Sequence, residues 1–563
     1  MYSFKNLIKD IKTHKKEFLF AQFIALLAVL ISIPLPLLMP ILIDEVLLDK
    51  PGIWTRIISN FFLNCDGSCY ILITLFVVLF LRSLNVFLNI LQTYHFEKIT
   101  KDIANKIRYR LLKHLKLLST NEFENLQTGD IASRVINDIE TIEDFLVRLV
   151  SKFAISIFTL IGISIILLMI NWQLGLFIII LNPFVVILSI KLSKKVKIYK
   201  KEHNKSISLF QEALLETLEL FEQIKAFNKE NLFFQKLFNL SDSLKEKSLK
   251  FNYKIEAYNK FSFLIFLLGF EVFRAAGIFA VFYGNLSIGL MIAVFSYLWY
   301  MMTPIQELIS MQYRFFAAKA ALDRINEILS LEIETTKEKI KFDSTITIKA
   351  KNLSFKYKSS DWILKNINFT INPNKITALI GASGEGKTTL AKIIAGFLEP
   401  KEGEILYNNI SSKDINLFQI RENINLILQE HRLFNDTLLF NITLSKKFSE
   451  EEIYNALKLV EMYDVVNKWK NGLNTYVGKN GVKLSGGQRQ RIVLARAILH
   501  KPKVIILDES TSALDVQTEH KVFENIKEFL KQRTTIIIAH RPETITKADE
   551  VLILQNKEIK KLD

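Results

Sequence analysis

Residues 376–389 of the chain read ITALIGASGEGKTT. The opening ITALI is an uninterrupted apolar run, which is typical of a strand buried on both faces of a sheet. The stretch after it, Gly381-Ala382-Ser383-Gly384-Glu385-Gly386-Lys387-Thr388, fits the phosphate-binding pattern G-x-x-x-x-G-K-[ST], and the helix-forming TTLAKIIAGFL follows without a break. Strand, glycine-rich loop and helix in this order predict an α/β domain that binds a nucleoside triphosphate.

Each part of the loop has an expected role toward the nucleotide. Its glycines let backbone N–H groups wrap a phosphate chain at the start of a helix. Lys387 is expected to reach the β- and γ-phosphates, the Thr388 hydroxyl to bind Mg²⁺, and Thr389 to complete the nucleotide-binding set. Glu385 is an acid beside phosphates, so its side chain is expected to point away from them.

A second apolar run, VIILD (504–508), predicts another buried strand. Asp508 at its end is expected in the Mg²⁺ shell, and the adjacent Glu509 is expected to activate the attacking water as general base. Short β-branched runs alternate with helical patterns from residue 346 onward, which predicts a parallel sheet. We therefore expect a nucleoside-triphosphate-binding α/β domain over 346–563.

The first 310 residues are far more apolar and predict a membrane domain. Six stretches are long enough to cross a bilayer, which takes about 20 residues each. They are 18–43, 70–95, 146–170, 172–193, 260–283 and 287–305. Helix-rich polar links between the second and third spans and between the fourth and fifth predict helices that continue well into the cytoplasm.

The distribution of Lys and Arg orients these spans. The link 96–145 carries 8 of them and the link 191–258 carries 14, whereas the outer loop 46–69 has only Lys50 and Arg56. By the positive-inside rule, the long links and the N-terminus are cytoplasmic. Residues 1–17 predict a basic amphipathic helix on the inner membrane surface. The expected domains are 1–17, a membrane domain over 18–324, a linker over 325–345, and 346–563.

Composition excludes several classes of protein. Of 563 residues, 50% are hydrophobic and 23% are charged, which excludes disordered and fibrous chains. The formal net charge of +16 raises the question of nucleic acid, but the basic residues lie largely in loops between apolar runs, where membrane topology accounts for them. No nucleic-acid partner is expected.

The two cysteines, Cys65 and Cys69, both lie in NCDGSC on the outer loop. Disulfides persist in that compartment, so a bridge is the first interpretation. Two free thiols or a pair of metal ligands remain alternatives, although two sulfurs alone make a poor zinc site.

Between the phosphate loop and Asp508 stands Leu484-Ser485-Gly486-Gly487-Gln488. With this pentapeptide, the 346–563 region resembles the nucleotide-binding domain of an ATP-binding cassette (ABC) transporter. Over its whole length, the chain resembles an ABC exporter half-transporter such as the bacterial lipid, multidrug and peptide exporters. The resemblance implies ATP and Mg²⁺ as ligands and a location in the bacterial inner membrane, with the cassette cytoplasmic.

Further site residues follow from this resemblance. Tyr357 matches the aromatic residue that stacks on adenine, Gln429 the glutamine that senses Mg²⁺ and the attacking water, and His540 the histidine at the γ-phosphate. Ser512-Ala513-Leu514-Asp515 matches the loop between paired cassettes. In the family, Ser485, Gly486, Gly487 and Gln488 cap the γ-phosphate held by the partner's phosphate loop, so the working unit is expected to be a homodimer, with a heterodimer as alternative.

The resemblance also bears on the membrane domain. Residues 128–138 and 224–227 resemble the segments that couple the spans to the cassettes. One departure is Lys479 after Val477-Gly478, where the family usually has an acidic residue in a loop that contacts those segments.

The substrate is expected to be lipid-like, amphipathic or drug-like, moved across the inner membrane. Peptide or protein export is one alternative, and an ATP-gated channel or regulator is another. Charges inside spans are costly and point to function. Arg82, Glu271 and Arg274 are such charges. One interpretation is a Glu271–Arg274 pair with Arg82 solvated in a central cavity; the other is that Arg82 or Arg274 contacts an anionic substrate group.

Overall fold

The structure is a computed structural model. It describes residues 2–50, 52–61, 66–124, 126, 128–284, 286–334, 342, 345–357, 361–508, 514–539 and 545–562, without some helix side chains that lie mainly in 181–197. The chain forms two compact units. The membrane unit comprises Met1–Lys113 and Thr128–Ser330, and the cassette unit comprises His114–Gln127 and Leu331–Asp563.

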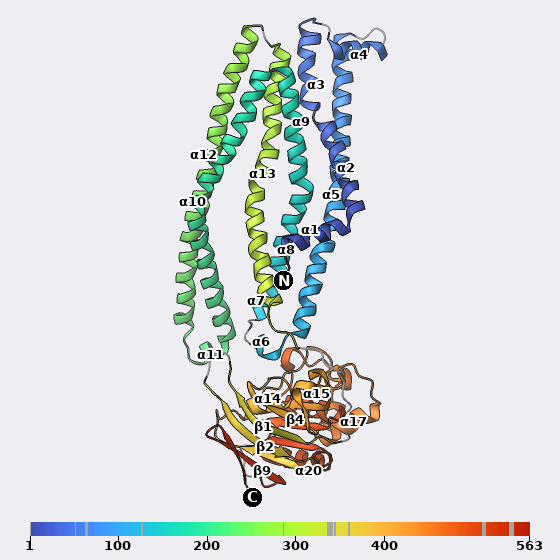
Figure 1. The fold of residues 1–563 in the computed structure, drawn as a ribbon, viewed down its shortest axis with the longest axis vertical. Helices are drawn as coiled ribbons and strands as arrows, with labels where there is room; N and C mark the ends of the chain where they lie inside the picture. The colour runs from blue at the N-terminus through green and yellow to red at the C-terminus, as the bar shows by residue number, and fades with distance from the viewer. Residues whose placement is uncertain are drawn as a thin grey trace. The chain divides into compact units, whose positions relative to one another are not determined.

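The membrane unit is all helical (Figure 1). Its elements are α1 (Phe4–Thr13), α2 (Lys15–Ser32), α3 (Leu35–Leu42), the π-helix η1 (Ile43–Leu47), α4 (Ile53–Phe61), α5 (Gly67–Leu117, whose last turn belongs to the cassette unit), α7 (Thr128–Ser133), the π-helix η2 (Arg134–Asp138), α8 (Ile139–Val147), the π-helix η3 (Arg148–Phe153), α9 (Ala154–Ile170), α10 (Trp172–Glu219), α11 (Phe221–Ala226), α12 (Glu230–Phe282) and α13 (Ile288–Leu329).

Apolar helical stretches long enough to cross a membrane confirm five of the six expected spans. Within the described residues they are Lys15–Leu47, Gly67–Leu117, Thr128–Ile170, Glu230–Phe282 and Ile288–Leu308. The remaining expected span, 172–193, forms the first part of α10, where many side chains lie outside the described set.

The tight turns between spans form where the sequence predicts them, and capping side chains fix them. Asn171 Oδ1 accepts the N–H groups of Gln173 and Leu174, both at 3.1 Å, and so starts α10. Ser287 Oγ accepts the Leu290 N–H at 3.2 Å and starts α13. These oxygens satisfy amides that have no partner within the first turn of a helix.

Helix α13 is the centre of the membrane unit and packs against α3, α8 and α9, while α10 and α12 lie side by side (Figure 1). Its Tyr297 is fully buried, and its hydroxyl donates to the Ile33 carbonyl at 2.8 Å. Ile33 stands at the break between α2 and α3, just before Pro34. The hydroxyl therefore bonds a carbonyl at an interrupted helix, where the regular ladder of bonds ends.

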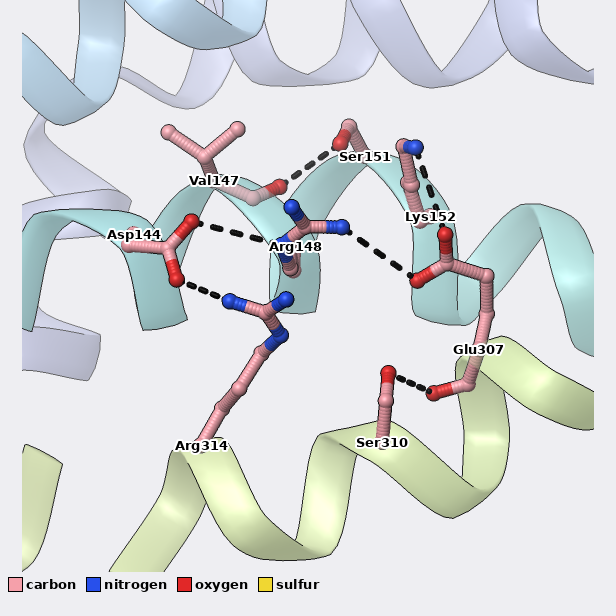
Figure 2. A network of polar contacts seen from close by, with 8 residues as sticks. All are labelled: Asp144, Val147, Arg148, Ser151, Lys152, Glu307, Ser310 and Arg314. Atoms are coloured by element: carbon pink, nitrogen blue, oxygen red, sulfur yellow. Dashed lines mark hydrogen bonds and ion pairs between the residues drawn. The ribbon is translucent and has the colours of Figure 1, made fainter. Parts of the chain in front are cut away.

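Charged side chains also join α13 to the α8–η3 segment, as Figure 2 shows. Arg148 Nε lies 3.3 Å from Asp144 Oδ1, and Arg314 pairs with the other oxygen of Asp144. Glu307 lies 3.3 Å from Lys152 Nζ and 3.6 Å from Arg148 Nη1. The network thus holds three cations against two carboxylates, which leaves it one positive charge in excess.

The N-terminal helix α1 is tied to two long helices. Tyr2 is 3% exposed, its N–H donates to Asn326 Oδ1 at 2.6 Å, and Asn326 Nδ2 donates to the Tyr2 carbonyl at 2.7 Å. Asp10 accepts from the Tyr2 hydroxyl and pairs with Lys106 of α5. These bonds fix α1 to both α5 and α13.

The described residues of the cassette unit form two sheets. Its strands are β1 (Ile348–Phe355), β2 (Leu364–Ile371), β3 (Ile376–Ile380), β4 (Glu402–Tyr407), β5 (Ile410–Ser411), β6 (Ile424–Ile427), β7 (Val504–Asp508), β8 (Thr534–Ile538), β9 (Glu550–Gln555) and β10 (Glu558–Leu562). Its helices are α6 (Thr120–Glu124), α14 (Lys387–Ile394), α15 (Leu417–Asn423), α16 (Leu438–Thr443), α17 (Glu450–Leu459), α18 (Tyr463–Asn467), α19 (Gly486–Leu499) and α20 (Val516–Lys531), with short 3₁₀ turns η4 (Ser412–Asp414), η5 (Gly472–Asn474) and η6 (Lys479–Gly481).

The larger sheet has the order β10-β9-β3-β8-β7-β6, and all of it except β10 is parallel, as expected. Val504 and Ile506 of β7 enter one hydrophobic core, and Ile505 and Leu507 enter the other. This alternation explains why VIILD is apolar at every position except its end.

The smaller sheet, in the order β2-β1-β4-β5, is antiparallel and was not predicted. Register shifts between Ala350 and Phe355 interrupt the alternation of buried and exposed residues along β1, so its sequence gives a weak strand signal.

Candidate nucleotide site

The phosphate loop occupies the turn from β3 to α14, as its sequence predicts. Two of its glycines are required by geometry. Gly381 has φ +156°, and a Cβ there would collide with the Leu554 carbonyl oxygen. Gly386 has φ +100° at the start of α14, and its Cβ would lie 2.7 Å from Ile363 Cγ2. Other residues would therefore distort the loop.

The polar side chains of the loop bond to the surrounding chain. Lys387 is 6% exposed, and its Nζ donates to the carbonyls of Gly381 at 2.9 Å and Ala382 at 2.8 Å. The ammonium is thus held against the backbone of the loop's first two residues. The Thr388 hydroxyl donates to Asp508 Oδ2 at 2.8 Å, which joins two motifs 120 residues apart in sequence.

Sheet topology explains why these motifs meet. β3, β8, β7 and β6 are parallel neighbours, so their carboxyl ends lie at one edge, where α/β sheets bind ligands. The phosphate loop follows β3, Asp508 ends β7, and Gln429 comes two residues after β6. Glu509 and His540 lie outside the described residues, although β7 is described up to Asp508 and β8 is followed by the described Ala539.

Thr388 and Asp508 together offer the kind of oxygen ligands that Mg²⁺ prefers. Mg²⁺ prefers oxygen ligands, commonly one or two carboxylates together with phosphate oxygens and water. A hydroxyl oxygen and a carboxylate oxygen 2.8 Å apart, beside a phosphate-binding loop, fit that donor set.

Two other predicted residues lie near the loop in sequence or space. The Tyr357 ring, half-buried just after β1, packs edge-on against the Phe355 ring with centroids 5.1 Å apart. Glu385 Oε2 accepts the Lys557 N–H at 3.4 Å, so this acid is directed to the β9–β10 turn. Of the remaining loop residues, Ala382, Ser383 and Gly384 are exposed and Thr389 is buried.

The pentapeptide Leu484–Gln488 starts helix α19. Ser485 and Gln488 form a capping box, in which Ser485 Oγ accepts the Gln488 N–H at 3.2 Å and Gln488 Oε1 accepts the Ser485 N–H at 3.0 Å. Gly486 and Gly487 occupy the first turn, where amides have no acceptor within the helix. This exposed helix start can receive an anion from outside the chain.

Asp515 caps helix α20 and accepts the Thr518 N–H at 2.9 Å. That backbone hydrogen bond holds the pKa of the Asp515 carboxyl below its usual range. Ser512 and Ala513 before it lie outside the described residues.

Two family models match the chain. The ABC transporter transmembrane region matches residues 18–305, and the ABC transporter domain matches residues 364–512. The chain belongs to the ABC transporter family. It is a multi-pass protein of the bacterial inner membrane that couples ATP hydrolysis to export.

Individual relatives cover most of the transporter. The ATP-dependent lipid A-core flippase of Mannheimia succiniciproducens is 31% identical, over 86% of this chain and 83% of the relative. YgaD of Bacillus subtilis, a multidrug export ATP-binding/permease protein whose name marks that assignment as provisional, is 28% identical over 98% and 94%. A solved bacterial Atm1-family ABC exporter with ATP bound aligns at a TM-score of 0.80 with 22% identity, over 97% and 94%, which shows the shared fold.

The expected coupling segment 128–138 and the residues just before it fall into different units, and the coupling role of 128–138 stays a prediction. Residues 114–127, including α6, belong to the cassette unit, whereas 128–138 belong to the membrane unit. There Arg134 pairs with Asp130 and Glu327, each at 2.8 Å, and Asp138 pairs with Arg324. The second expected segment corresponds to α11, within the membrane unit. Lys479 is exposed at the start of η6.

Two of the three charges in the transporter's spans are paired with each other. Arg274 Nη1 lies 3.0 Å from Glu271 Oε1, so these two form the pair that was one of the two alternatives. Arg82 is exposed on α5. The expected bridge between Cys65 and Cys69 stays a prediction because Cys65 lies outside the described residues.

Sequence reasoning missed the polar contacts of the transporter's residues 114–127 and 332–334. Arg421 binds Glu334, and Lys392 binds Glu124. The partners lie 87 and 268 residues apart, so neither pair has a local sequence signal.

Proposed function

We propose that two copies of this transporter form the working unit, and that it exports or flips a lipid-like, amphipathic or drug-like molecule by alternating access. The ATP-dependent part of this proposal rests on the Thr388–Asp508 hydrogen bond of 2.8 Å, because it joins the phosphate loop to the carboxylate expected at Mg²⁺.

ATP is the substrate of the hydrolytic step, and each site residue has a proposed role. The loop amides and Lys387 hold the β- and γ-phosphates, while Tyr357 stacks on the adenine ring. Glu509 accepts the proton of the attacking water as it adds to the γ-phosphorus, and His540 and Gln429 orient the γ-phosphate and that water. ADP leaves as the bond to the bridging oxygen breaks.

Mg²⁺, when bound, would neutralise charge on the β- and γ-phosphate oxygens. Thr388, Asp508 and Gln429 are the residues proposed to hold it. The hydroxyl and carboxylate of the first two already lie together and need no rearrangement of the backbone to do so.

The dimer is proposed from the exposed start of α19. Ser485, Gly486 and Gly487 form an anion-binding helix start, and the chain has one phosphate loop matched by the family pattern. Two copies facing each other would place each helix start on the phosphates bound by the other copy, with Asp515 between them. Two competent sites favour a homodimer over a heterodimer.

The substrate class rests on the relatives and on the membrane unit. The relatives described above are named as a lipid A-core flippase and a multidrug export protein, which favours lipid-like or amphipathic substrates. The charge network of Figure 2, with one excess positive charge, is compatible with an anionic group. Peptide export and an ATP-gated channel are not favoured by these relatives.

The test is ATP hydrolysis by the purified transporter in lipid nanodiscs, with Glu509→Gln as the blank, across lipids, amphipathic drugs and peptides. Stimulation by lipids or amphipathic drugs is expected. Stimulation by peptides alone would contradict the proposed substrate class, and ion conductance gated by ATP would contradict pumping.

A further inference from the structure

The transporter's chain passes from the membrane unit into the cassette unit twice, and the two connecting segments are bonded to each other. The first, 114–127, begins in the last turn of α5, and the second follows α13, at Leu331. Leu118 and Ile333 form an antiparallel bridge. The Glu334 N–H donates to the Leu117 carbonyl at 2.8 Å, and the Ser119 N–H donates to the Glu332 carbonyl at 3.2 Å. The ends of two spanning helices thus lead into the cassette as one paired strip, residues 117–119 and 332–334.

Arg421 of α15 anchors this strip. Its Nη1 lies 3.0 Å from Glu334 Oε2, and its Nη2 bonds the other carboxylate oxygen, so the pair is bidentate. The Glu334 side chain is only 5% exposed. Buried, two-pronged pairs of this kind fix both distance and orientation, and lysine cannot reproduce them.

The same guanidinium also bonds the segment that follows α14. Arg421 Nε and Nη2 donate to the Gly396 carbonyl at 3.2 and 2.9 Å. The group lies 5.2 Å from the centre of the Phe397 ring, which holds it in place. Arg421 therefore connects the paired strip to the C-terminal end of the helix that starts at the phosphate loop.

A second contact joins α14 to α6, the helix that follows the first half of the strip. Lys392, in the last turn of α14, lies 2.8 Å from Glu124 of α6. Both connecting segments are thus attached near the end of a helix whose first residue is Lys387. Because a helix of this length is stiff, a displacement of its phosphate end displaces these two attachments as well.

We propose that Arg421 is a positioning residue for transport: through Glu334 it transmits movement of the phosphate-loop helix to α5 and α13. The inference rests on the ATP-driven export proposed above but not on any substrate class. Arg421 itself touches neither nucleotide nor substrate.

The test uses Glu334→Gln in the full-length transporter in nanodiscs. This variant keeps the shape of the side chain and leaves the Arg421–Gly396 bonds available, but it removes the charge pair. The matched control is Glu550→Gln, which removes another carboxylate that is 7% exposed and paired with a lysine, Lys375 at 2.7 Å, inside the same unit. A merely structural role predicts the same behaviour for both variants.

Two readouts are compared before and after addition of ATP and vanadate, with no transported substrate present. They are the ATP concentration dependence of basal hydrolysis, and hydrogen exchange of backbone amides in both units. In Glu334→Gln, KM for ATP and protection of the phosphate loop should match the wild type. The ATP-dependent change in exchange along α5 and α13 should fall about fivefold or more. In Glu550→Gln it should persist.

The proposal is overturned if Glu334→Gln shows the same ATP-dependent change in hydrogen exchange along α5 and α13 as the wild type. It is also overturned if this change falls equally in the membrane unit and the cassette unit. Arg421→Lys, which cannot form the bidentate pair, should show a defect of the same kind. If Glu334→Gln does not fold, Arg421→Lys is judged by the same criterion. A wild type without any ATP-dependent change in its membrane unit would instead contradict ATP-driven export itself.

Discussion

The ATP site of the cassette unit and the Glu271–Arg274 pair of the membrane unit hold their charged side chains in opposite ways. Lys387 and Asp508 are 6% and 3% exposed, and hydrogen bonds to the phosphate loop fix both. In the membrane unit, the paired side chains of Glu271 and Arg274 are 61% and 47% exposed. Rigid, buried charges suit one reaction on one nucleotide. Exposed charges on long helices suit substrates or lipids of varied shape.

The largest effect should come from Glu509→Gln in the cassette. Loss of the proposed general base should lower ATP hydrolysis by about 10²–10⁴-fold for every substrate, while ATP still binds. Hydrolysis and nucleotide binding, measured on the same preparation, check this prediction. Near-normal turnover would exclude Glu509 as the general base. It would also contradict the view that the fixed charges of the ATP site serve one reaction.

Asp508→Asn should lower ATP hydrolysis less than Glu509→Gln does, but again for every transported substrate. The amide keeps the hydrogen-bond acceptor for Thr388 but loses the charge that attracts a divalent cation. Hydrolysis should need a higher Mg²⁺ concentration and should fall about tenfold or more at a fixed one. A Mg²⁺ titration measures both effects, with the exposed Asp414→Asn as control. An unchanged titration would exclude Asp508 from the metal site.

Changes in the membrane unit should act on selectivity instead of on hydrolysis. Arg82→Ala should leave basal hydrolysis intact and reduce stimulation by anionic relative to neutral amphipathic substrates by up to about tenfold, which corresponds to about 1.4 kcal/mol. Stimulation curves for matched anionic and neutral lipids measure this ratio. An unchanged ratio would mean that Arg82 is simply solvated.

The smallest effect on transport should come from Glu550→Gln. The hydrogen bond from Lys375 holds the pKa of the Glu550 carboxyl below its usual range. A carboxyl with a lowered pKa in the folded state stabilises the fold above its unfolded pKa, roughly 4.3, and this contribution is lost as the pH falls through the folded pKa. The variant should therefore have a lower Tm than the wild type at pH 7, and the difference should shrink below about pH 4. A pH-independent difference would contradict the ion pair as its cause.

Local sequence patterns predicted the elements that carry the ATP site. β3, the phosphate loop, β7 and the turn at Asn171 all depend on neighbouring residues: an apolar run, glycines at positive φ, or a capping side chain. The topology of the sheet then brings Thr388 and Asp508 together, which parallel strands made predictable.

Contacts between distant residues were not predictable in this way. The Arg421–Glu334 pair, the Tyr2–Asn326 bonds and the antiparallel sheet depend on the tertiary fold, and their residue types occur throughout the chain. The place of residues 114–127 in the cassette unit was not predictable for the same reason, because nothing in them distinguishes them from the rest of a polar helical link.

The discontinuous cassette unit has a consequence for the order of events during synthesis. Ser119 leaves the ribosome about 215 residues before Glu334, its neighbour in the paired strip. At about 5–20 residues per second, that delay is roughly 10–40 s. Most of the membrane helices are therefore made while α6 and the end of α5 still lack their partners. A chaperone or protease that binds exposed helix ends has its opportunity during this interval, before the cassette is complete.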